Sequence, residues 1–281
     1  MYISDAIHGG GVGTTDGRFH SRINMAQGQK RAFGRMSGEV FTGSGGAATA
    51  FEELIKRAVG STSADTSARD NGFTPGFPLI LSPGGGTTFQ YPKSGGVSKA
   101  CISEFTLDGN LGGNVTFTSS IVSAGRESNA ATPGASTYSY EQQPQTNDDS
   151  NPLPYWASQF SITGSGETDV SDRIRAWDLR INNNTQEIFT FNGSQFAFDI
   201  LQGVFDITGS FSYYSSDGNF VNSLTQGAVL TITLGSGESL IVPFVAFGEQ
   251  PIPLPGLNAP TVRNVNWTGL ATINGAAIYR A

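Results

Sequence analysis

The sequence has 281 residues with 37 Gly and 13 Pro, too small a share of these two residues for a low-complexity polymer, so disorder as the default state is excluded. Charged residues make up only 14% and aromatic residues 11%, a composition that favours sheets and loops around an apolar core. The net charge of −7 is uneven: residues 1–140 carry 11 Lys and Arg against 10 Asp and Glu, whereas residues 141–281 carry 5 against 13.

The cysteine count and the hydropathy pattern bear on where the chain folds. A single cysteine, Cys101, excludes an internal disulfide, so the fold can mature in a reducing cytoplasm, and we expect this thiol to be buried. No run of 18 apolar residues and no signal-peptide pattern occur, so we expect neither a membrane-spanning segment nor export.

The amino-terminal segment is predicted to be a flexible, locally basic arm. Gly9–Gly13 superficially resembles a phosphate-binding loop, but no strand precedes it and no Lys-Ser/Thr pair follows, so we interpret it as a flexible arm. Farther along, a stretch without any acidic residue contains five basic ones: Arg18, Arg22, Lys30, Arg31 and Arg35. Because basic arms bind acidic surfaces, we expect this arm to contact the acidic half of a neighbouring copy.

One helix is predicted at 48–59. Phe51, Leu54, Ile55 and Ala58 follow the i, i+3, i+4, i+7 spacing of an amphipathic helix, and Gly60 follows its end. We expect this helix to lie on a sheet.

Alternating apolar and polar residues predict strands through most of the remaining chain. The predicted strands are Val97–Leu107, Asn114–Val122, Gln159–Thr163, Ile174–Ile181, Glu187–Phe191, Val204–Tyr214, Val229–Leu234, Ser239–Phe247, Thr261–Leu270 and Ala276–Tyr279. Asp-Gly pairs that begin at Asp16, Asp108 and Asp217 predict turns. Ser61–Gly86 and Gly125–Tyr155 are predicted long loops, and the second is a natural linker.

The order of these elements suggests an internal duplication. Met36–Phe41 precedes the predicted helix, as Ile207–Ser212 precedes a shorter segment of similar character, Phe220–Gly227. Phe105–Gly109 and Val265–Gly269 then each lead into a further strand. The chain is therefore predicted to be mainly β, with two tandem units at 1–124 and 156–281, a linker at 125–155 and a short helix flanking each unit.

Residues suited to catalysis are scarce. The two histidines, His8 and His20, both lie in the predicted arm, and no nucleophile elbow, zinc motif or calcium loop occurs. Glu104 and Asp108 would lie on one face of a strand about 13 Å apart by strand rise, beyond the roughly 5–9.5 Å that glycoside hydrolysis requires. We therefore expect no enzyme activity, no metal and no cofactor.

The carboxyl-terminal half carries a resemblance to a known family. In order along the chain, seven short blocks resemble the tail tube proteins of long-tailed bacteriophages: Pro154–Trp156, Phe160–Asp169, Ser171–Ile174, Trp177–Asn183, Gly209–Asp217, Leu224–Gly227 and Ile252–Asn258. The resemblance implies tail-tube-like β-sandwich or barrel units that form rings, stacked into a tube through which DNA passes into the host. Combined with the duplication, it predicts trimeric rings with pseudo-six-fold symmetry, with hexameric rings as the other arrangement.

The same resemblance directs the choice of functional residues. Because an acidic channel would not retain DNA, the candidate channel-lining residues are the strand-borne acids Glu104, Asp108, Asp178 and Asp206. The candidate contacts between rings are the five basic residues of the arm together with Asp148 and Asp149 of the linker. Expected partners are further copies of the chain, the tape measure, terminator and baseplate proteins, and DNA without sequence-specific binding. The protein would be made in the host cytoplasm and located in the virion tail.

A second interpretation remains open from the sequence. A monomeric carbohydrate-binding or adhesin β-sandwich explains the composition and the aromatic residues Tyr138, Tyr140, Tyr155 and Trp156 equally well. It explains neither the duplication nor the absence of an export signal.

Overall fold

A computed structural model defines the fold of the chain. It describes residues 2–13, 19–40, 54–55, 58–59, 79–81, 89–91, 100–123, 127–128, 152–163, 171–191, 197–215, 228–235, 238–248, 261–270 and 279–280.

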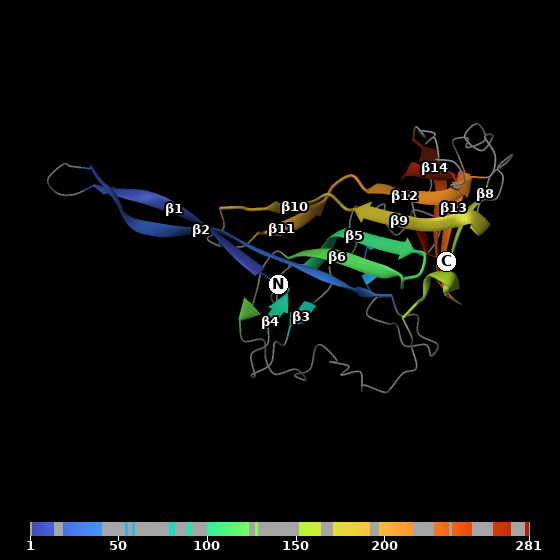
Figure 1. Cartoon of the computed structure of the whole chain (residues 1–281). Helices are drawn as coiled ribbons and strands as arrows, with labels where there is room; N and C mark the ends of the chain where they lie inside the picture. The colour runs from blue at the N-terminus through green and yellow to red at the C-terminus, as the bar shows by residue number, and fades with distance from the viewer. Residues whose placement is uncertain are drawn as a thin grey trace.

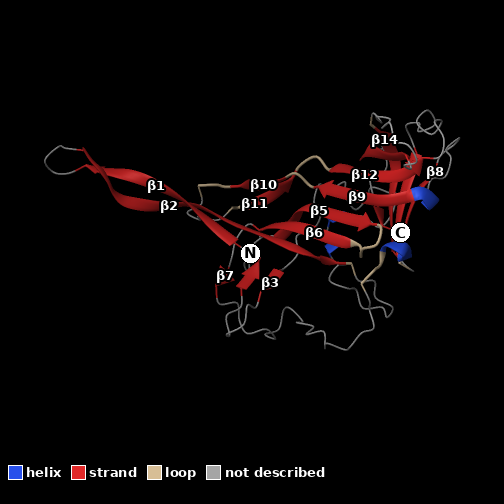
Figure 2. Ribbon diagram, viewed as in Figure 1, coloured by secondary structure: helices blue, strands red, loops and turns tan. Residues whose placement is uncertain are grey.

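Strands dominate these residues (Figure 2). They are β1 (Tyr2–Gly13), β2 (Phe19–Glu39), β3 (Leu79–Leu81), β4 (Phe89–Tyr91), β5 (Ala100–Asn110), β6 (Thr116–Ser123), β7 (Glu127–Ser128), β8 (Ser158–Thr163), β9 (Ile174–Asn182), β10 (Thr185–Ile188), β11 (Asp199–Gln202), β12 (Asp206–Ser215), β13 (Ala228–Leu234), β14 (Glu238–Phe247), β15 (Thr261–Gly269) and β16 (Tyr279–Arg280). Two single-turn 3-10 helices, η2 (Tyr155–Ala157) and η3 (Ser171–Arg173), flank β8 and β9. The prediction of a mainly β protein is confirmed.

Eleven strands form one antiparallel sheet (Figure 1). Its order is β1-β2-β6-β5-β9-β12-β15-β14-β13-β8, and β16 pairs with β14. β5 from the first predicted unit pairs with β9 from the second along seven residue pairs, from Glu104↔Asn182 to Asn110↔Ala176. The two predicted units therefore share one continuous sheet.

The alternation in the sequence gives this sheet one apolar face. In β5 the side chains of Phe105 and Leu107 are buried, while Thr106 between them is only partly covered. The sheet curls, so that Phe160 of β8, at the far end of the strand order, stacks on Trp177 of β9 at a ring-centroid distance of 6.1 Å and contacts Phe211 of β12 in a tilted arrangement at 5.3 Å. The apolar face thus encloses the core between the central strands and β13, β14 and β8.

Four residues of the predicted helix 48–59 are described. Leu54, Ile55, Ala58 and Val59 have helical backbone conformation and are buried in the core. The carbonyl of Ala58 accepts a hydrogen bond from Asn183 Nδ2 at 3.5 Å. The other helix positions lie outside the described residues, so the helix as a whole stays a prediction.

The interpretation of Gly9–Gly13 as a flexible segment is wrong. Gly9–Gly13 lies in β1, and β1 and β2 form a long hairpin that projects away from the rest of the sheet, with β10 and β11 running beside its base (Figure 1). This segment lacks the apolar alternation used to predict strands. Its pairing runs from Tyr2↔Phe33 to Gly13↔Phe19 and uses backbone groups, which do not depend on the side chains.

The turn predicted at Asp108 is also wrong. Asp108 and Gly109 are within β5, and the turn to β6 comes at 111–113, where Gly112 has a φ of 86°. Gly109 serves a packing need instead, since a Cβ there would lie 2.7 Å from Cζ2 of Trp177 on β9.

Short strands also occur inside the two predicted long loops. β3 lies in the first and β7 in the second, and with β4 they form a three-stranded sheet. Cys101 is buried, as expected. Within the described part of the chain, no helix has the length and apolar character needed to cross a membrane.

Candidate functional site: the polar face of the sheet

The side of the central strands opposite the core carries polar side chains in register. Residues paired directly across antiparallel strands share a face, so the pairings define one surface over β2, β6, β5, β9, β12 and β15. We call this surface the polar face. Its members are Arg35, Ser37, Glu39, Thr116, Thr118, Ser120, Glu104, Thr106, Asp108, Asp178, Arg180, Asn182, Asp206, Thr208, Ser210, Asn266 and Thr268.

All four acids proposed from the sequence as channel-lining residues lie on this face. Asp108 of β5 is paired with Asp178 of β9, and Asn182 of β9 is flanked by Glu104 on one side and Asp206 on the other. With Glu39 and the two arginines, the face carries five carboxylates against two guanidinium groups, an excess of three negative charges.

The pair Asp108 and Asp178 places like charges directly opposite each other. Burial raises the pKa of the Asp108 carboxyl, and the neighbouring charge of Asp178 raises it further. Asp178 in turn accepts a hydrogen bond from the Ser210 hydroxyl.

The other two acids have partners that fix their orientation. Glu104 Oε1 lies 2.7 Å from Arg180 Nε, in a pair exposed enough that we assign it little stabilisation. Asp206 Oδ2 accepts a hydrogen bond of 2.7 Å from Asn184 Nδ2. Asn184 has a φ of 44°, a left-handed conformation that Asn tolerates, and it turns the chain from β9 into β10.

The structure places the predicted contact residues of the arm in β2. Arg22, Lys30, Arg31 and Arg35 all belong to this strand, whereas Arg18, Asp148 and Asp149 lie outside the described residues. Arg31 Nε lies 3.1 Å from Glu187 Oε2 on β10, and its guanidinium carbon lies 5.9 Å from the centroid of the Phe189 ring. The basic strand thus meets an acid from the second half of the same chain.

Burial and charge act in opposite directions on Glu187. Burial raises the pKa of its carboxyl, and the Arg31 guanidinium lowers it by a smaller amount.

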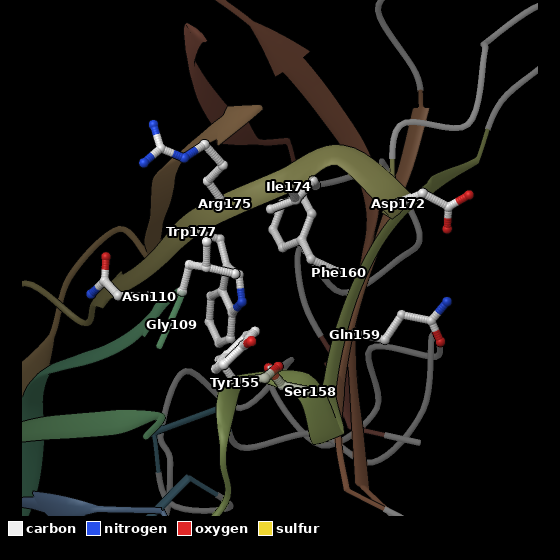
Figure 3. Close-up of a pocket in the computed structure, with 11 residues that line it drawn as sticks. Gly109, Asn110, Tyr155, Ser158, Gln159, Phe160, Asp172, Ile174, Arg175 and Trp177 are labelled. Atoms are coloured by element: carbon white, nitrogen blue, oxygen red, sulfur yellow. The ribbon is translucent and has the colours of Figure 1, made fainter. Parts of the chain in front are cut away.

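A pocket of about 140 Å³ lies beside β8 and the start of β9, at the end of the sheet opposite the β1–β2 hairpin (Figure 1). Figure 3 shows the rings of Tyr155, Phe160 and Trp177 around it, with Arg175 and Asp172 at its margin. The guanidinium carbon of Arg175 lies 4.9 Å from the centroid of the Tyr214 ring. The pocket is large enough for one side chain or a small ring.

The sequence did not predict this pocket, and of its lining residues only Tyr155 was named as a candidate for binding. Its residues come from β5, the β5–β6 turn, η2, β8, η3 and β9, and no local motif connects these segments. The adjacent Trp156 is 75% exposed, so the aromatic pair Tyr155 and Trp156 was the one signal in the sequence that pointed to this pocket. In the described part of the chain, no group of three or more His, Cys, Asp or Glu residues could hold a metal ion.

Comparison with known proteins adds the family. A search of curated proteins finds no match. A family model described as phage tail tube protein matches residues 15–278, which include every strand of the polar face. The chain therefore belongs to the phage tail tube protein family and is a structural component of the virion tail.

Proposed function

We propose that the chain polymerises as stacked rings around a central channel, and that the polar face lines this channel for DNA passage into the host. The observation that carries this proposal is that all four predicted acids lie, with many Ser, Thr and Asn residues, on one face of a sheet whose other face encloses the core. Duplex DNA carries about one negative charge per 1.7 Å, so a wall with excess negative charge does not retain it through counterion release.

We further propose that the sheet consists of two equivalent units, as the duplication in the sequence predicts. The strand order supports this: β1-β2-β6-β5 is followed by β9-β12-β15-β14. If the four strands of each set are numbered in chain order, both sets have the spatial order first, second, fourth, third. Both sets also begin with a long hairpin. In the first set it is formed by β1 and β2, and in the second by β9 and β12, whose connection forms the further strand pair β10–β11.

Residue pairing supports the same equivalence. In the first unit Gly38 of β2 is paired with Phe117 of β6, which is paired with Leu107 of β5. In the second unit the corresponding pairs join Gly209, Trp267 and Phe247, listed from β12 through β15 to β14. The segments 114–118 and 264–268 read NVTFT and NVNWT.

This equivalence changes part of the repeat that the sequence suggested. Met36 is still equivalent to Ile207 in this alignment of the two units. The strand equivalent to β15, however, is now β6 rather than β5. Two units per chain would build a ring of three chains with pseudo-six-fold symmetry, whereas a ring of six chains would need one unit from each. We propose the trimeric ring, assembled in the host cytoplasm and joined in the tail by the tape measure, terminator and baseplate proteins.

Electron microscopy of the purified protein tests the assembly. We expect rings or tubes, whereas a 29.5-kDa monomer at every concentration would contradict the proposal and favour the carbohydrate-binding or adhesin module, with the aromatic pocket as its site.

The role of the channel wall is tested by adding a positive charge to the polar face. Thr208→Lys changes an exposed position on this face, and Thr163→Lys makes the same change at an exposed position on β8, away from it. Both variants should form tubes. We expect virions with Thr208→Lys to eject DNA more slowly, with a rate that depends on salt, and virions with Thr163→Lys to eject it at the unmodified rate. Equal ejection rates for the two variants would contradict a channel-lining role.

A further inference from the structure

We infer that the pocket lined by Tyr155, Phe160 and Trp177 binds the Phe191 side chain of another copy of this chain, located in the next ring of the stack. We call this pocket the aromatic pocket. The inference rests on the proposed function, because it names one contact by which stacked rings join.

The first observation is the size and lining of the aromatic pocket. Its volume is about 140 Å³, and an apolar cavity of about 150 Å³ holds one benzene molecule. The rings of Tyr155, Phe160 and Trp177 lie around this space (Figure 3), and aromatic rings pack well on one another in offset or edge-to-face contacts. The pocket therefore fits one phenyl group.

The walls of the pocket are held in place by contacts within the chain. Trp177 packs closely over Gly109 of β5, where an added Cβ would lie 2.7 Å from Cζ2 of its ring. The Tyr155 N–H donates to the Gly113 carbonyl at 3.0 Å, and the Ser158 hydroxyl donates to the Tyr155 carbonyl at 2.8 Å. Because these walls are already ordered, binding a side chain costs little further ordering of the pocket.

The margin of the pocket favours an uncharged occupant. Arg175 and Asp172 lie there, and their opposite charges leave no excess of either sign. Asn110 and Gln159, which are exposed, contribute neutral polar groups.

The second observation is a phenyl group that the fold leaves in solvent. Phe191 follows β10 in the β10–β11 hairpin, and it is the most exposed large apolar side chain in the described part of the chain. Phe198 lies at the same end of this hairpin, where its N–H donates to the Ile188 carbonyl at 2.7 Å, and it is 59% exposed. Two exposed phenyl groups at one end of a hairpin form an apolar patch of the kind that marks a protein interaction site.

The third observation is that the pocket and Phe191 lie at opposite ends of one continuous segment. β9 begins at Ile174, beside the pocket, and runs to Asn182, from which the chain continues through β10 to Phe191 (Figure 1). β9 alone spans roughly 27 Å by strand rise, so Phe191 does not reach the pocket of its own molecule. The two features meet only between copies arranged head to tail, and a head-to-tail contact that does not close into a ring repeats along an open stack.

Exposed apolar side chains beside the pocket complete this contact. Leu111 is 53% and Trp156 75% exposed, and Phe198 of the incoming copy would cover them when Phe191 enters the pocket. A buried aromatic anchor surrounded by neighbours that exclude water is the arrangement in which one side chain carries much of the binding energy.

Substitution of Phe191 tests the contact. We expect Phe191→Ala to raise the protein concentration needed for tubes about tenfold or more while single rings still form, because the variant loses the burial of a phenyl group. Phe244→Ala is the matched control, since Phe244 is exposed on β14, a strand that contributes neither to the pocket nor to the β10–β11 hairpin. Its tubes should form within about twofold of the unmodified concentration. Sedimentation and electron microscopy measure rings and tubes, and thermal unfolding establishes that each variant folds.

A double-mutant cycle with Tyr155→Ala tests whether Phe191 enters this pocket. Tyr155 is 36% exposed, so its side chain is removed without opening the core. If both residues belong to one contact, the double variant should need a concentration within about threefold of that of the more impaired single variant. Effects that multiply, as at independent sites, would overturn the inference.

The remaining outcomes separate this inference from the proposed function. Phe191→Ala tubes that form at the unmodified concentration would overturn the inference and leave the proposed function intact. Loss of single rings in Phe191→Ala would also overturn it, because Phe191 would then join chains within a ring. An unmodified chain that never forms rings would contradict the proposed function itself.

Discussion

Gly38 and Gly209 occupy equivalent places in the two proposed units, yet substitution by alanine should affect them very differently. At Gly209 an added Cβ would overlap the carbonyl oxygen of Asp178 and lie 2.6 Å from Cε2 of Trp267. At Gly38 the nearest atom is Cε1 of Phe117 at 3.4 Å, close to an ordinary contact.

The size of the effect at Gly209 follows from what must move. Carbon atoms pack at about 3.5–4.0 Å, so the Trp267 ring, which is buried in the core, would have to shift by about 1 Å. Such overpacking costs about 1–3 kcal/mol, and displacing the Asp178 carbonyl between β9 and β12 adds about 1 kcal/mol. We expect Gly209→Ala to lose about 3 kcal/mol in the free energy of unfolding, or roughly 6–10 °C in Tm.

Gly38→Ala is the matched control for this prediction. Its strand is exposed, and alanine restricts the unfolded chain, so we expect the Tm to stay unchanged or to rise slightly. The assay is calorimetry of both variants below the concentration at which rings form, because assembly makes the Tm depend on concentration. Values of Tm for the two variants within about 1 °C of each other would refute the packing argument.

Three further predictions concern charge. Asp108→Asn should stabilise the protein by about 0.5 kcal/mol at pH 7, because folding raises the pKa of Asp108 above its ordinary value of 3.8, so that stability falls as the pH rises through this region. In urea titrations the gain should vanish below about pH 3.8, where the carboxyl is protonated in both states, and a gain independent of pH would contradict this. Arg263 is 3% exposed, and its buried Nε and Nη1 have no hydrogen-bond partner within the described part of the chain, so Arg263→Met should raise the Tm of the unassembled chain by about 2 °C or more, whereas a lower Tm would indicate that the charge is compensated. Arg31→Ala should raise the pKa of Glu187 further, as measured by NMR titration, and an unchanged pKa would show that the pair does not form in solution.

The sequence alone was enough to assign most strands and the faces of their side chains. In β9, Trp177 and Leu179 are buried while Asp178 and Arg180 point to the polar face, as their alternation predicts. This works because a strand has a side-chain period of two, which is a local property of the backbone.

Glycine was the main source of error in reading the sequence. The β1–β2 hairpin was missed because its Gly-rich pairing uses backbone groups that leave no hydrophobic pattern. Gly109 was assigned to a turn, yet its small size serves the contact with Trp177, a residue 68 positions away in the chain. Neither use of glycine can be distinguished from a turn without the neighbouring strand.

The sequence by itself determined a mainly β chain, its family and the acidic character of its second half. Only the tertiary structure decided that Glu104, Asp108, Asp178 and Asp206 share one face. This depends on register and strand order between segments far apart in the chain, which are set by the packing of the whole core rather than by local periodicity.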